Sequence, residues 1–321
     1  MGTPVTLHSV ARQGPLGQRI EVPGSGYRAG VTGLRYDIVD VFTDRAFAGN
    51  PLAVVHGAAE LSAAALQAIA AEFGLSETAF LLPPTAPSAD YRLRIFTPRT
   101  ELRFAGHPSV GSAWVLARAG LIPIGPVVQE CAAGLIDVQV DQTGAQVDGA
   151  TPAVGPPVDG AALAAAVGLT PTELDPSLGP GVAAAGAPFA FLPVLPAAVA
   201  RTAADPDGIR AVVPEPLGVA VVAFNRDTRH GHVRMFRPES RSGEDPATGS
   251  AAVALAVFLV DRGALTSQGR SMFTVLQGAE IGRPSRLDVA VVAENGVATR
   301  TSVRGGVVAV AQGELVAWPD R

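Results

Sequence analysis

The chain has 321 residues, of which 48% are apolar, 17% charged and 5% aromatic, and its formal net charge is −5. A chain with this charge and no basic block is a poor partner for nucleic acid. Its 24 basic residues are all arginines, which excludes a pyridoxal phosphate Schiff base, a lysine nucleophile and a phosphate-binding loop that needs lysine.

Cysteine occurs once, at Cys131. One sulfur cannot form an internal disulfide, a zinc knuckle or a pair of opposed catalytic thiols. A lone thiol is typical of the reducing cytoplasm, where we expect this chain to reside. The longest apolar run, at residues 251–260, is about half of the roughly 20 residues that span a bilayer, so we expect no membrane segment.

The length of the chain predicts two domains, because a chain beyond roughly 250–300 residues usually splits its core. We expect an N-terminal extension to precede them. Residues 1–33 are rich in glycine, proline and arginine and are predicted to lie outside the main fold. A proline-rich stretch at residues 155–157 marks a junction. It predicts a first domain at residues 34–152, completed by a C-terminal strand at residues 310–321, and a second domain at residues 153–309.

Apolar alternation with a period of two predicts the strands, and a period near 3.6 predicts three helices. Strands are expected at residues 36–42, 52–55, 75–82, 91–96, 135–140, 219–224, 233–236 and 287–292. Helices are expected at residues 61–73, 109–119 and 249–262, the first between Ser62 as N-cap and Gly74 as terminator. The third helix has no charge before Asp261, which places it inside a domain. Sheets wrapped around buried helices indicate an α+β fold.

Glu77 is the first candidate for chemistry. The alternation in its strand places its carboxylate on a face with apolar neighbours. Burial disfavours the charged form and would raise its pKa from about 4.3 toward neutrality, where one group can both take and return a proton. The ordinary alternative is an edge position with the carboxylate in solvent.

The two halves of the chain contain an internal repeat. Phe-Thr-Pro at residues 96–98 leads to HPSVGSA at 107–113, and Phe-Arg-Pro at 236–238 leads to DPATGSA at 245–251. Each unit reads as a strand, a loop and the start of a buried helix, so the repeat implies duplicated domains that face one another.

The helix starts of the repeat predict a binding site for an acid. Their first N–H groups have no intrahelical acceptor and carry partial positive charge, so two starts facing one cleft would bind a carboxylate. Gly111 and Gly249 would let a ligand approach the backbone, and Ser112 and Ser250 would add hydroxyl groups. The alternative is ordinary helix capping by serine and threonine.

Several strings occur in order over residues 36–316 and together resemble the phenazine-biosynthesis PhzF-like family, which has the diaminopimelate epimerase-like fold. They are YDIVDVF (36–42), GNP (49–51), LSETAF (75–80), FTP (96–98), ELRFAGHP (101–108), GEDPATGSAA (243–252), QG (277–278), IGRPS (281–285) and a closing hairpin at 303–316.

The resemblance implies two pseudo-symmetric domains, each an antiparallel or mixed sheet wrapped around a buried helix, with the active site between them. It also implies a cofactor-independent isomerase that moves a proton on a small carboxylic acid. The family's named activity is isomerisation of trans-2,3-dihydro-3-hydroxyanthranilate. We expect no cofactor and no metal, and a homodimer as the assembly.

The family's functional residues map onto positions in these strings. The general acid/base maps onto Glu77, while His107 and Asp245 would position the substrate and relay protons. The remaining substrate contacts map onto Ser76, Gly106, Gly249 and Ser250. In the epimerase branch two cysteines stand at the helix starts, where this chain has His107 and Asp245 instead.

Two rival functions remain open. One is an epimerase or racemase acting on another small acid, which the missing thiols disfavour. The other is a non-catalytic protein that binds a small acid, which would not require Glu77, His107 and Asp245 together. His230 and His232 could supply two metal ligands, but no third ligand is assignable, and the alternative is a loop between strands.

Overall fold

The computed structural model describes residues 33–215, 218–238 and 243–318. The predicted extension therefore lies, apart from Gly33, outside the described residues. Over these ranges a mixed sheet and a few helices give an α+β fold, as the sequence predicts. The helices are α1 (Ala63–Phe73), α2 (Gly106–Arg118), α3 (Gly160–Ala166), α4 (Pro196–Val199), α5 (Pro206–Val212) and α6 (Gly249–Asp261), with 3-10 turns at Ala58–Glu60 and Pro171–Glu173.

The strands are connected through their pairings into one sheet. In chain order they are β1 (Leu34–Val41), β2 (Asn50–Val55), β3 (Glu77–Leu82), β4 (Tyr91–Phe96), β5 (Glu101–Leu102), β6 (Gly125–Cys131), β7 (Gly134–Val140), β8 (Gly144–Asp148), β9 (Pro152–Val154), β10 (Gly181–Ala185), β11 (Ala187–Pro193), β12 (Val219–Asn225), β13 (His230–Phe236), β14 (Glu244–Asp245), β15 (Gly269–Gln277), β16 (Ser285–Glu294) and β17 (Val297–Leu315).

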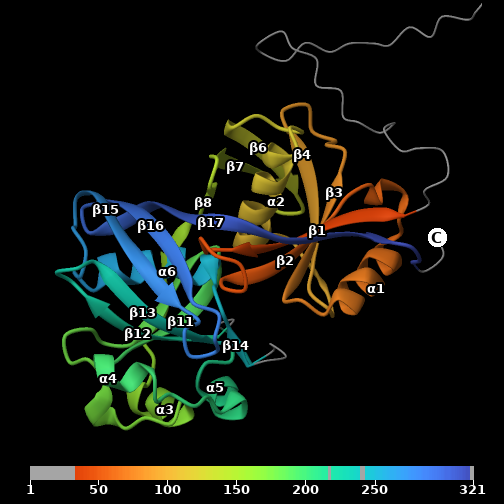
Figure 1. The fold of residues 1–321 in the computed structure, drawn as a ribbon. Coiled ribbons are helices and arrows are strands. Elements are labelled where there is room, and N and C mark those ends of the chain that lie inside the picture. The colour runs from red at the N-terminus through yellow and green to blue at the C-terminus, as the bar shows by residue number, and fades with distance from the viewer. Residues whose placement is uncertain (1–32, 216–217, 239–242, 319–321) are drawn as a thin grey trace, which may run out of the picture. The chain divides into compact units, whose positions relative to one another are not determined.

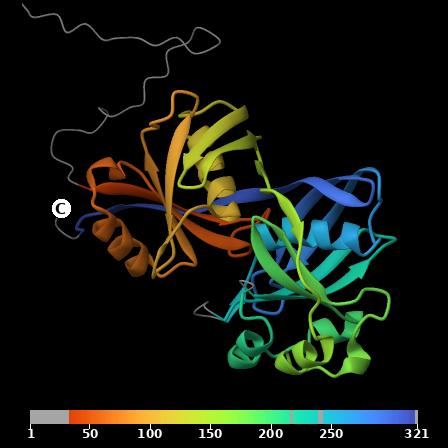
Figure 2. The same cartoon turned by 180° about the vertical axis from the view of Figure 1, so that it is seen from behind.

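Two helices are enclosed by strands (Figure 1). Helix α2 packs against β1, β2, β7 and β8, and α6 packs against β10, β11, β16 and β17. Every residue of α6 from Ala251 to Val260 is buried, which confirms the prediction of an internal helix. The shorter helices α3, α4 and α5 cover the outer face of β11 and β12, where a second apolar core forms (Figure 2).

Strand β17 corrects the predicted closing hairpin, because residues 297–315 form one continuous strand. Its first part pairs with β16 and its last part with β1, both antiparallel. Within this strand, Gly305 and Gly306 allow close packing. A Cβ atom on Gly305 would lie 2.1 Å from the Phe42 ring, and one on Gly306 would lie 2.6 Å from the Thr43 carbonyl oxygen.

The ends of α1 follow the sequence signals. The Ser62 hydroxyl accepts a hydrogen bond from the Ala65 N–H at 3.2 Å, and Gly74 ends the helix in the left-handed region at φ 62°. His230 and His232 differ from their expected place, because they lie within β13 and not in a loop. Among the described residues, no helix is long and apolar enough to cross a membrane.

Candidate active site

A cavity of about 570 Å³ lies where β3, β14 and the starts of α2 and α6 converge. Seven of its lining residues carry the chemistry considered below: Glu77, Gly106, His107, Arg237, Asp245, Gly249 and Ser250. The structure thus brings together most of the site residues that the sequence predicts.

The starts of α2 and α6 meet at this cavity. A Cβ atom on Gly106 would lie 3.7 Å from the Cα atom of Gly249, so the two helix starts approach each other closely. Neither N-cap residue, Ala105 or Thr248, caps its helix with a side-chain hydrogen bond, whereas Ser62 caps α1. The first N–H groups of both helices are therefore left for a ligand, and their partial positive charge favours a carboxylate.

Glu77 is the first residue of β3 and is only 5% exposed. Its Oε2 atom lies 3.5 Å from Nε2 of His107, and its Oε1 atom lies 3.9 Å from Nη1 of Arg237. Burial raises the pKa of Glu77, and the charge of Arg237 and the Ser76 hydroxyl oppose this rise only in part. The prediction of a buried carboxylate with a raised pKa is confirmed, and the solvent-exposed alternative is wrong.

His107 is a buried residue in the first turn of α2. Burial lowers its pKa to about 4, despite the opposing charge of Asp245, so the imidazole is neutral at pH 7. At 3.5 Å its Nε2 atom is too far from Glu77 for a normal hydrogen bond, and it has no partner among the described residues. A buried polar atom without a partner beside a cavity is available to a ligand.

Asp245 lies in β14 and is held from several sides. One carboxylate oxygen accepts a hydrogen bond from Nδ2 of Asn50 at 3.0 Å, and the other accepts one from the Thr248 hydroxyl at 2.5 Å. Its main-chain carbonyl accepts a hydrogen bond from Nε2 of Gln277 at 2.7 Å. Burial raises the pKa of Asp245, and the negative charge of Glu77 raises it further.

Ser76 acts on this site through Asn50. Its hydroxyl donates to Oδ1 of Asn50 at 2.9 Å, while Nδ2 of Asn50 donates to both Asp245 and the carbonyl of Ala247. Asn50 is fully buried and joins β2 to β14. Ser76 is exposed and is not one of the cavity-lining residues, so the structure places it next to the site and outside the cavity.

Comparison with known proteins identifies the family of this chain. A family model for phenazine biosynthesis-like proteins, PhzC-PhzF, matches residues 39–313. The chain belongs to this family. An uncharacterized isomerase from Mesorhizobium japonicum is 39% identical over 87% of this chain and 98% of its own length. The trans-2,3-dihydro-3-hydroxyanthranilate isomerase of Pseudomonas chlororaphis is 32% identical over 88% and 99%.

Solved structures of related proteins have the same fold. A PhzF-family phenazine biosynthesis protein from Bacillus anthracis matches with a TM-score of 0.81 at 25% identity, over 89% of this chain and 99% of its own. A predicted epimerase from Pseudomonas aeruginosa matches with a TM-score of 0.74 at 34% identity, over 88% and 99%. A hydroxyproline epimerase from Agrobacterium vitis, at 15% identity and a TM-score of 0.60 over 88% and 92%, shares the fold alone.

Gly111 and Ser112 are predicted site residues that the structure removes from the cavity of this PhzC-PhzF family member. A Cβ atom on Gly111 would lie 2.6 Å from Cδ2 of Leu52 and 2.8 Å from Cγ2 of Val41, so this glycine lets α2 pack on the sheet. The prediction fails because α2 begins at Gly106, not at Ser109. Pro108 stands in its first turn, where proline is tolerated.

Arg237 is the cavity residue that sequence reasoning missed. It is the middle residue of the repeated Phe-x-Pro string, at which the first half has Thr97. Asn50 and Gln277 belonged to strings that carry the resemblance, but neither had an assigned role. The difference between Thr97 and Arg237 was the available signal, since a charge at one of two matched positions marks a difference in chemistry.

The other chemically active side chains lie elsewhere. Cys131 is buried in β6, with Sγ 3.6 Å from the Gly134 carbonyl oxygen, and is not one of the cavity-lining residues. Nε2 of His232 lies 2.8 Å from Oε1 of Glu280. Among the described residues, no group of three or more histidine, cysteine or acidic side chains could hold a metal.

Proposed function

We propose that this protein is an isomerase that moves a proton between two carbons of a small carboxylic acid, without cofactor or metal, like the trans-2,3-dihydro-3-hydroxyanthranilate isomerases it resembles. One observation carries the proposal: a buried carboxylate with a raised pKa, Glu77, lies beside a cavity that is also lined by two uncapped helix starts. A small acid bound there by its carboxylate would place its carbon chain near Glu77.

The proposal includes two pseudo-symmetric domains, at residues 34–152 with the C-terminal strand and at residues 153–309. The pairings support it. From β1 to β8, leaving out β5, successive pairs are antiparallel, parallel, antiparallel, parallel, antiparallel and antiparallel. From β10 to β17, leaving out β14, the order is the same. In each half a two-residue strand, β5 or β14, precedes the enclosed helix.

In the proposed reaction Glu77 removes a proton from one carbon and delivers it to another. The first C–H bond breaks, its electron pair enters the conjugated acid, and an O–H bond forms on Glu77. That proton then forms a new C–H bond, so Glu77 ends as it began. Negative charge that grows on the substrate carboxylate is stabilised by the N–H groups at the starts of α2 and α6.

His107 and Asp245 complete the proposed site. Neutral His107 would contact the substrate through its free Nε2 atom. Asp245, fixed by Asn50 and Thr248, would position the substrate and relay a proton. Because Glu77 and Asp245 share a buried space, the charge of one raises the cost of ionising the other.

The rival functions fit this geometry less well. An epimerase of the kind considered needs two opposed thiols, but the chain has one cysteine, Cys131 in β6. A non-catalytic binder would gain nothing from a buried acid, because an ionisable group in a low-dielectric site costs stability. The cytoplasmic location and the homodimer remain predictions, the second to be tested by light scattering.

The decisive variant is Glu77→Gln, which keeps size and hydrogen bonding but removes the titrating group. We expect turnover to fall by about 10²- to 10⁴-fold, as for a lost general acid–base group. Binding of a substrate-like acid should survive, because the helix starts hold its carboxylate. The measurement is solvent-deuterium incorporation into a panel of small acids, beginning with trans-2,3-dihydro-3-hydroxyanthranilate, alongside calorimetric affinity. Exchange at the wild-type rate in the variant contradicts the proposal.

A further inference from the structure

Two arginines three residues apart, Arg234 and Arg237, have very different surroundings. Arg234 is buried in β13, and its guanidinium makes six hydrogen bonds, two of them to the carboxylate of Glu244. Arg237 follows β13, lines the cavity and has a side chain that is 26% exposed. Within the described residues its guanidinium makes no hydrogen bond, and its one ion pair is the 3.9 Å approach to Glu77.

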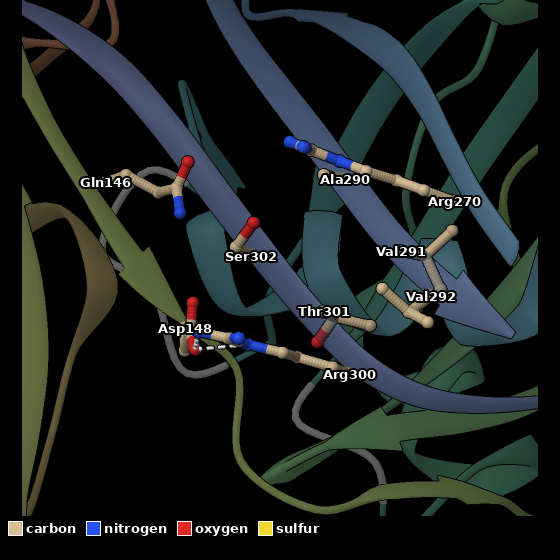
Figure 3. A pocket seen from close by; sticks show the side chains of 9 residues that line it. All are labelled: Gln146, Asp148, Arg270, Ala290, Val291, Val292, Arg300, Thr301 and Ser302. Carbon is tan, nitrogen blue, oxygen red and sulfur yellow. Dashed lines mark hydrogen bonds and ion pairs between the residues drawn. The ribbon is translucent and has the colours of Figure 1, made fainter.

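Several other arginines of the described chain lie much closer to a carboxylate. Arg304 lies 2.6 Å from Asp141, and Arg94 lies 2.7 Å from Glu101. A shallow depression of about 210 Å³ shows the same pairing (Figure 3). There Arg300 lies 2.6 Å from Asp148, so its charge is already matched. Arg237 is therefore a cation at a cavity, and the described residues offer it no hydrogen-bonded anion.

Glu77 does not form a hydrogen-bonded ion pair with Arg237, because its Oε1 atom and Nη1 of Arg237 are 3.9 Å apart. Burial also raises the pKa of Glu77. Arg103 also lines the cavity, but it is exposed and donates to the Ala132 carbonyl oxygen at 3.3 Å. The positive charge at Arg237 is thus left for a bound molecule.

The carboxylate of Glu77 separates Arg237 from the helix starts. Its Oε2 atom faces His107, in the first turn of α2, and its Oε1 atom faces Arg237. A substrate whose reacting carbons lie at Glu77 can therefore hold one acid group at the helix starts and a second acid group at Arg237. The planar guanidinium is suited to a second carboxylate, which it binds through two parallel hydrogen bonds.

We propose that Arg237 binds a second carboxylate of the substrate, so that this isomerase acts on dicarboxylic acids. This inference rests on the proposed function, because it assigns the substrate class of the same site. A monocarboxylic acid would leave the guanidinium unmatched, whereas a diacid satisfies both ends of the cavity.

The test compares diacids with near-isosteric monoamides in calorimetric titrations: succinate against succinamate, and glutarate against glutaramate. Wild-type protein should bind at least one diacid about ten-fold or more tightly than its monoamide, in keeping with a charge-assisted hydrogen-bonded pair. Arg237→Met should bind both members of that pair as weakly as wild type binds the monoamide. Arg237→Lys should restore part of the preference.

Two matched variants serve as controls. Arg270→Met removes an arginine at the depression of Figure 3, outside the cavity, and should keep the wild-type preference. Arg103→Met removes the other cavity-lining arginine and should keep it as well. Thermal unfolding of each variant shows whether a lost preference reflects a lost fold, and Arg237→Lys keeps the test decisive if Arg237→Met is unstable.

The proposal is overturned if wild type binds no diacid more tightly than its monoamide, if Arg237→Met keeps the preference, or if Arg103→Met alone loses it. It is also overturned if Arg237→Met shifts the pH profile of deuterium exchange while the diacid preference stays unchanged. Arg237 would then act only on the charge of Glu77. Failure of the proposed function is a separate result: deuterium exchange is absent with every acid although the diacid preference is present.

Discussion

Glu77 and Asp245 are two buried acids at one cavity, and each makes the other harder to ionise. Neutral His107 cannot relieve this cost with a positive charge, since burial lowers its own pKa to about 4. Arg237 is the nearby cation, and it is not hydrogen-bonded to either acid. The electrostatic interactions in the site are therefore unfavourable. Substrate binding and proton transfer to Glu77 would relieve them.

Glu77→Gln should accordingly make the protein more stable at alkaline pH. The folded-state pKa of Glu77 lies above its ordinary 4.5, so its contribution to stability is complete below that value and is lost as the pH rises through the folded-state pKa. Glutamine does not ionise, so the variant does not lose stability as the pH rises through this range. We expect a gain of about 1 kcal/mol in the free energy of unfolding at pH 8, and less at pH 5, in denaturant titrations.

Glu101→Gln is the matched control with the opposite sign. A hydrogen bond from Arg94 lowers the pKa of Glu101, so its stabilising contribution is present above the ordinary value. This variant should be slightly less stable than wild type, by an equal amount at pH 5 and pH 8. If Glu77→Gln were also less stable than wild type by an equal amount at pH 5 and pH 8, burial would not raise the pKa of Glu77.

The residue scale also shows what a sequence can reveal. The alternation of period two predicted that Glu77 lies on a buried face of its strand, although Thr78 and Phe80 on the other face of β3 are fully buried as well. The position of Arg237 was not predicted. Arg237 follows the predicted strand end at Phe236, but it lines the cavity because β14 pairs back onto β13. A strand of only two residues, such as β14, is too short to show an alternation, so no local pattern predicts this pairing.

At the scale of elements, the repeated strings mislead about the two enclosed helices. Gly249 is the first residue of α6, but its counterpart Gly111 is the sixth residue of α2. The helix start was misplaced because Pro108 reads as a helix boundary, although it lies within the first turn. Matching glycines of the two similar strings thus have different roles: Gly249 lines the cavity, and Gly111 packs against Leu52 and Val41.

Gly111→Ala should therefore damage stability. The added methyl group has 2.6 Å to Cδ2 of the fully buried Leu52, so α2 or the sheet must shift. We expect a loss of about 1–3 kcal/mol, typical of overpacking, measured by denaturant unfolding.

The control is Gly179→Ala, where an added Cβ meets nothing within 4 Å. It should stay within about 0.5 kcal/mol of wild type. An unchanged stability in Gly111→Ala would show that the glycine is not required for packing and would reopen a role in binding.

At the scale of the whole molecule, a partly buried polar cluster joins the beginning of the described chain to its end. Asp37 in β1 accepts a hydrogen bond from Nε2 of Gln312 in β17 at 2.8 Å and lies 2.7 Å from Nε2 of His56. Burial alone would raise the pKa of Asp37, but the hydrogen bonds from His56 and Gln312 and the nearby positive charges lower it. The ionised carboxylate thus stabilises the β1–β17 pairing.

Asp37→Asn should weaken the fold at neutral pH by about 1–3 kcal/mol, since a buried charge-assisted pair of hydrogen bonds is lost. The folded-state pKa of Asp37 is lowered from 3.8, so its contribution is present above that value and disappears as the pH falls through the folded-state pKa. The deficit of the variant should therefore vanish in acid. Asp137→Asn, at an exposed position of β7, should match wild type throughout in the same titrations.

Strand β17 also determines when the protein can finish folding. The ribosome completes β1 long before it makes β17, and their partners Asp37 and Gln312 are 275 positions apart. Until then β1 has an unpaired edge, which can pair with other nascent chains. Strand β9 follows β8 directly and pairs with β10. The sheet that contains β1 therefore cannot be completed until the last part of β17 has been translated.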